Sequence, residues 1–188
     1  MAIYNVFESV NMRSVHFAER IFDAVCEEPV ENGTFGYLEG LAEGESNIYK
    51  FVKGTKEGAE VVVANNPAWD YDTCRITNQR RDIFIIEAGV PFRAYVMKVT
   101  DEFGTAIEGF TADSRETVTG TADFTATPVY ATIDASGKLV ASTSETEGAV
   151  MSAQIMRKRM VSNSLVTKAH VYGSQKEIYE VKVNSLAK

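Results

Sequence analysis

Few side chains in this 188-residue sequence have the type and spacing that catalysis or metal binding requires. Asp70 and Asp72 form an Asp-x-Asp pair, which could hold a divalent cation together with the phosphates of a nucleotide. A glycine-rich phosphate loop does not accompany the pair, so we interpret it as a helix cap. Glu87 follows an apolar run, where a buried carboxyl can act as an acid catalyst, but we expect a Glu beside a turn to face solvent.

The histidines and cysteines do not form the pattern of a known site. His16 and His170 lie far apart in the sequence, and we expect His170 to be a packed or edge residue of a strand. Cys26 and Cys74 make no Cys-x-x-Cys pair, so we predict two reduced, buried thiols. The sequence therefore predicts no catalytic residue, no metal site and no cofactor, which indicates that the protein is not an enzyme.

The composition is that of an ordinary globular protein, with 45% hydrophobic residues, 24% charged residues and a net charge of −7. An acidic chain repels phosphate backbones, so we expect no nucleic-acid partner. The start lacks the basic head of a signal peptide, and no window approaches the roughly 18 apolar residues of a membrane helix. We therefore expect synthesis in the cytoplasm and no membrane partner. Arg157, Lys158 and Arg159 form a basic run, which is either a solvated edge or a docking site.

Short β-strands joined by turns are the dominant pattern of the sequence. Asn32-Gly33 predicts a hairpin, because Asn-Gly favours positive φ at both central positions of a type I′ turn. Residues 61–63 predict a short strand that ends at Asn-Asn-Pro. Residues 92–99 are largely apolar at both alternating sets of positions, which indicates a strand covered on both faces. Residues 129–142 predict a second hairpin with its turn at 134–137.

The last part of the sequence predicts a third hairpin, over residues 165–183. Its second strand, at 179–183, alternates apolar residues inward with Glu180 and Lys182 outward, the pattern of a sheet that is exposed on one face. Residues 105–147 are rich in Thr, Ala, Ser and Gly, which predicts short strands and exposed loops.

Two segments have helical patterns. The first, residues 17–26, repeats apolar side chains along one helical face. Phe22, Ala24 and Cys26 also alternate as they would in a strand, so helix and strand both stay open there. The second segment, residues 70–84, begins with aspartates that could cap a helix.

The segment around Gly89 predicts a structural turn. Gly89 would follow the second helix with positive φ, and Pro91 would fix φ where the next strand begins. The apolar residues on both sides of the turn are expected to be core. The turn at Gly89 and Pro91 would then aim the following strand into the barrel.

Several short strands separated by turn signals favour a mainly β fold. We predict a β-barrel or β-sandwich built from short hairpins, with one or two short helices and an extended N-terminal arm. Residues 1–27 would form this N-terminal arm or helix, and residues 28–188 a single β-rich domain.

Four stretches, in their order along the chain, resemble a known family. They are an Asn-Gly turn with Gly-Tyr-Leu after it (32–38), Pro67 with Tyr71-Asp72, Glu-Ala-Gly-Val-Pro-Phe-Arg-Ala-Tyr (87–95), and a Val-rich strand (179–183). This order resembles the head decoration, or cement, proteins of tailed bacteriophages over about residues 28–183. The segment 87–95 is its most specific part. The family often continues to Gly-Asp after this segment, whereas this chain has Lys98-Val99-Thr100-Asp101, and residues 1–27 have no counterpart.

The resemblance implies a non-enzymatic virion structural protein on the exterior of a phage capsid. Such a protein binds the outer surface of the shell and stabilises contacts between subunits of the major capsid protein. The implied partners are the major capsid protein and, on the shell, further copies of the chain itself. Interface hot spots favour Trp, Tyr and Arg. Outside the predicted strands, the candidate capsid contacts are Tyr4, Phe7, Trp69, Tyr71, Arg157 and Arg159.

Among these candidates, the arm with Tyr4 and Phe7 is favoured, because an extended segment can add a strand to a neighbour's sheet. The alternative is that both aromatics pack on their own domain. Two other functions stay open. One is another virion component, such as a head-fibre base or a tail accessory protein; the other is a carbohydrate-binding β domain that uses Trp69 and Tyr71.

Overall fold

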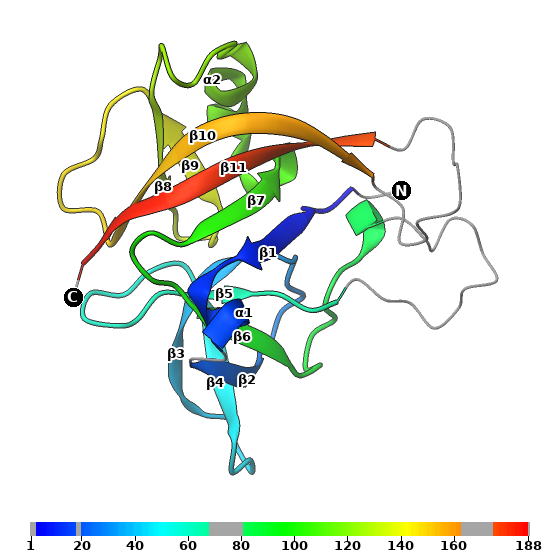
Figure 1. Cartoon of the computed structure of the whole chain (residues 1–188). Coiled ribbons are helices and arrows are strands. Elements are labelled where there is room, and N and C mark those ends of the chain that lie inside the picture. The colour runs from blue at the N-terminus through cyan, green and yellow to red at the C-terminus, as the bar shows by residue number, and fades with distance from the viewer. Residues whose placement is uncertain (1–2, 18–19, 68–80, 163–174, 188) are drawn as a thin grey trace.

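The computed structural model of the chain describes residues 3–17, 20–67, 81–162 and 175–187. They form a six-stranded sheet and a closed five-stranded barrel, which stack on each other (Figure 1). The prediction of a mainly β fold with a barrel and short helices is confirmed. Within the described residues, no helix has the length and apolar character needed to cross a membrane.

The six-stranded sheet contains β10 and β11, the longest strands of the described chain. All of its pairings are antiparallel. In spatial order the strands are β1 (Phe7–Asn11), β7 (Glu102–Ala106), β11 (Gln175–Leu186), β10 (Met151–Ser162), β8 (Val129–Ile133) and β9 (Leu139–Ser142). The strand that comes last in the chain, β11, therefore lies in the middle of the sheet.

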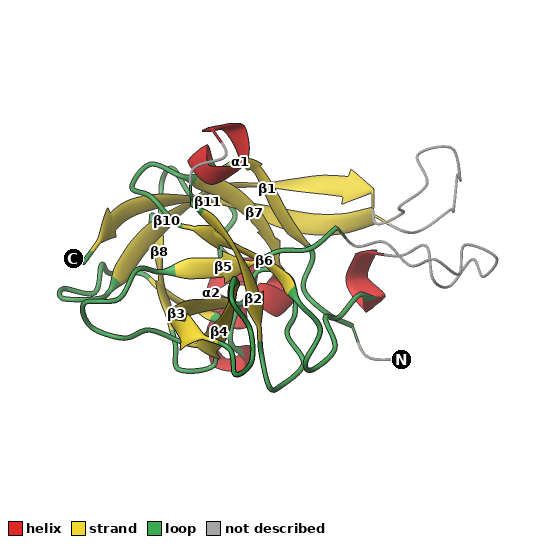
Figure 2. Ribbon diagram, turned by 90° about the horizontal axis from the view of Figure 1, so that it is seen from below, coloured by secondary structure: helices red, strands yellow, loops and turns green. Residues whose placement is uncertain are grey.

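The barrel is built from shorter strands, which lie below the sheet in Figure 1 and on the viewer's side in Figure 2. In spatial order they are β2 (Ile21–Val25), β4 (Ile48–Lys53), β3 (Phe35–Leu41), β5 (Val62–Ala64) and β6 (Phe92–Val96). Strand β2 pairs with β4 in parallel and with β6 in antiparallel orientation, which closes the ring.

Short helices and single 3-10 turns connect the strands. They are α1 (Arg13–Phe17), η2 (Arg81–Ile83), η3 (Ile107–Gly109), η4 (Ala112–Ser114) and α2 (Arg115–Gly120). A carboxylate from the loop between β6 and β7 holds the start of α1, because the backbone N–H of Arg13 donates to Oδ1 of Asp101 at 3.0 Å. Helix α2 buries Val118 in the core.

One hydrophobic core lies between the two layers, and a second fills the barrel. Strand β6 contributes to both, since Phe92 and Val96 point into the barrel while Tyr95 faces the interlayer core. In the interlayer core, the rings of Phe35 from the barrel and Phe103 from the sheet have centroids 5.5 Å apart. The prediction that this strand is covered on both faces is confirmed.

Residues 17–26 contain the end of a short helix followed by a strand. Helix α1 ends at Phe17, and β2 begins after it. The alternating pattern prevails because Ala24 and Cys26 are buried inside the barrel. The segment 1–27, expected as an arm or helix, contributes β1 to the sheet and β2 to the barrel.

The turn at Asn32-Gly33 is present, but it does not form the predicted hairpin. The N–H of Thr34 donates to the carbonyl of Glu31 at 3.1 Å, and only the glycine of the pair has positive φ. Val30, before the turn, pairs with Ile86, whereas β3, after the turn, pairs with β4 and β5. The turn therefore leads from one part of the barrel into another.

Of the other two predicted hairpins, one is confirmed and the other can be compared with the structure only in its second strand. The hairpin at 129–142 is confirmed as β8 and β9, and Oδ1 of Asp134 accepts hydrogen bonds from the N–H groups of Ser136 (2.9 Å) and Lys138 (2.8 Å). In the last hairpin β11 pairs with β10. The first strand expected for that hairpin, within residues 165–172, lies outside the described residues, as does most of the helix expected at 70–84. Tyr179, Val181 and Val183 of β11 are buried as predicted, and Ile178 on the opposite face is buried as well, against Val6 and Ala106.

Gly89 has the predicted positive φ, +74°, but no helix ends at this turn. The N–H of Val90 donates to the carbonyl of Glu87 at 3.2 Å, which places Gly89 third in a β-turn. The chain before the turn forms the bridge between Val30 and Ile86. The positive φ therefore arises from the turn itself and not from a helix end.

Two glycines with the same backbone conformation should differ in their tolerance of a side chain. Gly137, in the β8–β9 turn, has φ +78°, and a Cβ added there would lie 2.2 Å from the carbonyl oxygen of Phe35; a Cβ at Gly89 would meet nothing within 4 Å. We expect Gly89→Ala to lower the free energy of unfolding by about 1 kcal/mol, from backbone strain alone. Gly137→Ala should lower it by about 3 kcal/mol, because the steric contact adds to that strain. Urea unfolding measures both, and equal losses would contradict the steric account.

Candidate functional site

A β-bulge in β10 decides which side chains reach the outer face of the sheet. Ile155 pairs with Val181 and Arg157 pairs with Glu180, so Met156 is an extra residue between them. Ile155 and Val181 are buried on the inner face. Simple alternation would also direct Arg157 inward, and the bulge turns it outward.

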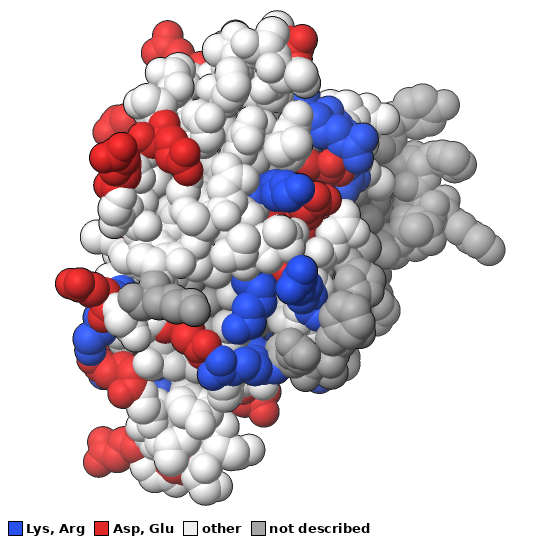
Figure 3. All heavy atoms as spheres, turned by 60° about the vertical axis from the view of Figure 1, so that its left-hand side comes forward, with Lys and Arg blue, Asp and Glu red and all other residues white. Residues whose placement is uncertain are grey.

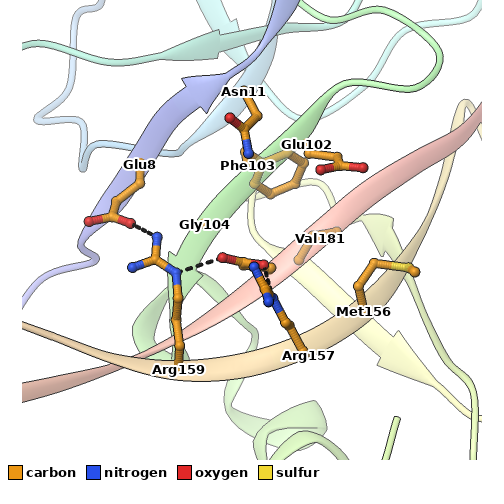
Figure 4. A pocket seen from close by; sticks show the side chains of 10 residues that line it. Glu8, Asn11, Glu102, Phe103, Gly104, Met156, Arg157, Arg159 and Val181 are labelled. Atoms are coloured by element: carbon orange, nitrogen blue, oxygen red, sulfur yellow. Dashed lines mark hydrogen bonds and ion pairs between the residues drawn. The ribbon is translucent and has the colours of Figure 1, made fainter. Parts of the chain in front are cut away.

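Beyond the bulge, five charged side chains form a row across the outer face, which we call the arginine–glutamate ladder; Figure 4 draws it without its end member Arg81. Glu180 accepts hydrogen bonds from Nε of Arg157 and, at 2.6 Å, from Nε of Arg159. Arg159 also donates to Glu8, and Glu8 accepts from Arg81 at 2.9 Å. The ladder therefore joins β10, β11 and β1 to the chain at η2.

A glycine in β7 makes room for the ladder. Gly104 lies between Glu8 of β1 and Glu180 of β11 in the strand register. A Cβ at this position would approach Cγ2 of Ile178 to 2.8 Å and Cβ of Glu8 to 3.3 Å. The bare backbone of Gly104 leaves space on this face for Arg159 to reach from β10 to β1.

The hydrogen bonds of the ladder also shift the pKa values of Glu180 and Arg157. The hydrogen bond from Arg157 holds the pKa of Glu180 below its ordinary value of 4.5, against the opposing effect of burial. The same hydrogen bond raises the pKa of Arg157. Both groups stay charged over the physiological pH range.

An open cavity of about 300 Å³ lies over the ladder. Its lining includes the ladder residues of β1, β10 and β11 together with Asn11, Glu102 and Met156. Arginine guanidinium groups recognise carboxylates, and a methionine thioether adapts its shape to an apolar partner. Met156 is 45% exposed, so the wall of the cavity combines fixed charges with an adaptable apolar side chain.

Positive and negative side chains are mixed on the surface of the molecule. On the face drawn in Figure 3, Lys and Arg side chains form a band that also contains Asp and Glu, while further acidic side chains follow the opposite edge. Ion pairs on β10 show the same mixing, since Lys158 also pairs with Glu177 at 3.3 Å.

Among the candidate contacts from the sequence, the structure brings Arg157 and Arg159 together through their shared partner Glu180. They lie within β10, so the expectation that they fall outside the strands is wrong. Phe7 is only 5% exposed and its ring centroid lies 5.4 Å from that of Phe103, so its prediction as an exposed anchor is also wrong. Phe7 points inward because β1 alternates and directs Glu8 outward.

The remaining predicted residues are not part of the ladder. Tyr4 is half-buried, and its N–H donates to the carbonyl of Asp82 at 2.7 Å. Pro91 is exposed at the start of β6. Cys26 is a free, buried thiol, as predicted. Several further residues of interest lie outside the described part of the chain, namely Trp69, Asp70, Tyr71, Asp72, Cys74 and His170.

Sequence reasoning missed four members of this site: Glu8, Arg81, Gly104 and Met156. The outward position of Glu180 was predictable from the alternation of its strand. The charged run at 157–159 marked one end of the ladder. Neither signal identifies Glu8, whose partnership with Arg159 spans 151 positions in the sequence.

No cluster of three or more His, Cys, Asp or Glu side chains suited to a metal ion occurs among the described residues. Comparisons of the chain with models of protein families, with curated proteins and with solved structures find no match. The site is therefore interpreted from its own chemistry, which combines guanidinium groups with an exposed thioether.

Replacing Glu180 with Gln should reveal the ladder as a pH-dependent source of stability. We expect Glu180→Gln to lower the free energy of unfolding by about 1 kcal/mol at pH 7. Because the folded-state pKa of Glu180 lies below 4.5, its contribution is present above that pH and is lost as the pH falls through the lowered pKa. Urea unfolding at pH 7 and at about pH 3 should show the wild-type advantage shrinking at low pH.

The matched control is Glu102→Gln, because Glu102 lies on the same sheet face but meets Lys182 only at 3.9 Å. This control should cost much less at pH 7. An advantage of the wild type over Glu180→Gln that stays constant with pH would contradict the role given to the ladder.

Proposed function

We propose that this chain is a non-enzymatic structural protein of a phage virion, which binds the outer surface of the capsid and stabilises contacts between subunits of the major capsid protein. The proposal rests on the resemblance carried chiefly by residues 87–95. In the structure these residues form an exposed turn (87–91) and the strand β6, whose residues are buried except Arg93. The buried strand supports the fold, and we take the docking surface from the outer sheet.

The observation that carries the choice of docking surface is the exposed half of β10. Met156, Arg157, Lys158, Arg159 and Met160 are all exposed along it. Arginine and methionine are enriched at protein interfaces, whereas lysine and glutamate are depleted. Met156 lines the same cavity as Arg157 and Arg159, so a partner that covers the ladder can also gain apolar contact there.

The ladder gives this surface a fixed geometry before any partner arrives. Arg159 is held by two carboxylates and Arg157 by one. Side chains that are already ordered lose less conformational entropy when they bind, which favours affinity. A rigid charged centre also sets the register of the partner.

The experiment that tests this function is co-sedimentation of the protein with purified shells that lack it, followed by imaging of the particles. We expect copies on the shell exterior, at points where capsid subunits meet. Copies on a tail or at the base of a head fibre would instead support another virion component. Failure to bind shells together with binding to glycans would favour a carbohydrate-binding domain.

The double variant Arg157→Ala/Met156→Ala should weaken shell binding at least about tenfold, since it removes one cation and one apolar contact from the docking surface. The matched control is Lys56→Ala/Leu41→Ala, which removes one exposed cation and one exposed apolar side chain from the barrel. Circular dichroism checks that both variants stay folded. Equal loss of binding by the two variants would contradict the assignment of this surface.

A further inference from the structure

Half of β10 lacks a strand neighbour on one side within the described chain. Strand β8 pairs with β10 only at Ala153–Ile155. Pro128 precedes β8 and carries no N–H, so the pairing stops there. Past the bulge, the described residues place β11 on one side of β10 and no strand on the other. We call residues 157–161 of this free side the open edge of β10.

The register shows which backbone groups face the open edge. The N–H of Ala106 donates to the carbonyl of Val6, so Ala106 is directed toward β1. Backbone groups alternate in direction along a strand, so the preceding residue, Thr105, is directed toward β11. Thr105 pairs with Tyr179, whose backbone groups are therefore directed toward β7.

The same alternation continues into β10. Because Tyr179 is directed toward β7, its other neighbour, Lys158, belongs to a non-hydrogen-bonded pair of β10 and β11. The same holds two residues further along, where Met160 pairs with Glu177. The N–H and C=O groups of Lys158 and Met160 thus face the open edge, while those of Arg159 bond to β11.

The side chains of the open edge determine what can pair with it. Arg157 is 71% exposed in its side chain and, among the described residues, gives only its Nε to a carboxylate. The charged residues of β10 between 157 and 161 are all cations, namely Arg157, Lys158 and Arg159, and the carboxylates that pair with them belong to β11 and β1, away from the open edge. The edge strand itself is therefore positive, in contrast with the net charge of −7 of the whole chain.

A second copy of the same edge fits poorly. Antiparallel pairing of β10 with β10 about Lys158 would set the three consecutive cations of one strand against those of the other. Like charges directly opposite each other destabilise a sheet, and charged edge strands prevent pairing of a sheet with itself.

We propose that the open edge of β10 binds an extended acidic segment of another protein as an added β-strand. The backbone groups of Lys158 and Met160 would pair with the added strand. Alternate acidic side chains of the segment would lie beside Arg157 and Arg159 on the outer face, and the intervening apolar side chains beside Met160 on the other face. Met160 is 56% exposed and can adapt to them. This inference concerns the class of partner and holds whether or not that partner is a capsid protein.

The test uses the full chain, labelled with 15N, and a synthetic peptide of alternating glutamate and valine with blocked ends. Titration should shift the amide signals of Lys158 and Met160 in a saturable way and slow their hydrogen exchange. A peptide of alternating lysine and valine should leave these signals unchanged. Equal effects of the two peptides, or no effect of the acidic peptide, would overturn the proposal.

Two variants separate backbone pairing from side-chain contact. Met160→Pro removes the N–H that faces the open edge, and should weaken binding of the acidic peptide at least about tenfold. Met160→Ala keeps that N–H and should stay within about threefold of the wild type. Equal binding by the proline variant and the alanine variant would overturn the proposal.

A fully N-methylated acidic peptide gives the same answer without changing the protein. It keeps every side chain and charge but cannot donate from its backbone, so it should not bind; binding would overturn the pairing. Shell binding and peptide binding are independent readouts. A protein that binds the acidic peptide but not the shells would reject the proposed function. A protein that binds the shells but not the acidic peptide would reject the added strand.

Discussion

The architecture depends on one constraint: strand β6 must be covered on both faces. Its Phe92 and Val96 require an apolar environment on one side, and Tyr95 requires one on the other. A single sheet exposed to solvent cannot provide both. The closed barrel covers the first face and the six-stranded sheet covers the second, so the two layers stack with β6 between two cores.

The strands could be predicted from local alternation of apolar and polar residues. The site could not, because its residues lie far apart in the sequence. The patterns around Tyr95 and Tyr179 predict buried strands, because an alternation of side chains can be recognised from neighbouring residues alone. The inward position of Phe7 depends on its pairing with β7, nearly a hundred residues away, so the sequence alone predicts an arm from a short segment without an evident core pattern. The contact of Arg159 with Glu8 and the space over Gly104 are likewise set by tertiary pairing, which no local pattern encodes.

Two local features determine the arrangement of side chains on the outer face: the extra residue of the β-bulge, Met156, and the glycine at position 104. The bulge at Met156 reverses the direction of every later side chain in β10 and so brings Arg157 out of the core. Gly104 then gives Arg159 a path across two strands. The ladder orders the side chains that border the open edge, so a rigid polar face and an unpaired backbone lie next to each other on one strand.

The central place of β11 affects the order in which the molecule can assemble during synthesis. All five barrel strands lie between residues 21 and 96, so the ribosome releases them as one continuous stretch. The sheet has to wait, because β7 and β10 both need β11, which is translated after them. A barrel that closes before then has the face of β6 that carries Tyr95 uncovered. A translational pause or a premature stop before residue 175 would leave this species open to aggregation.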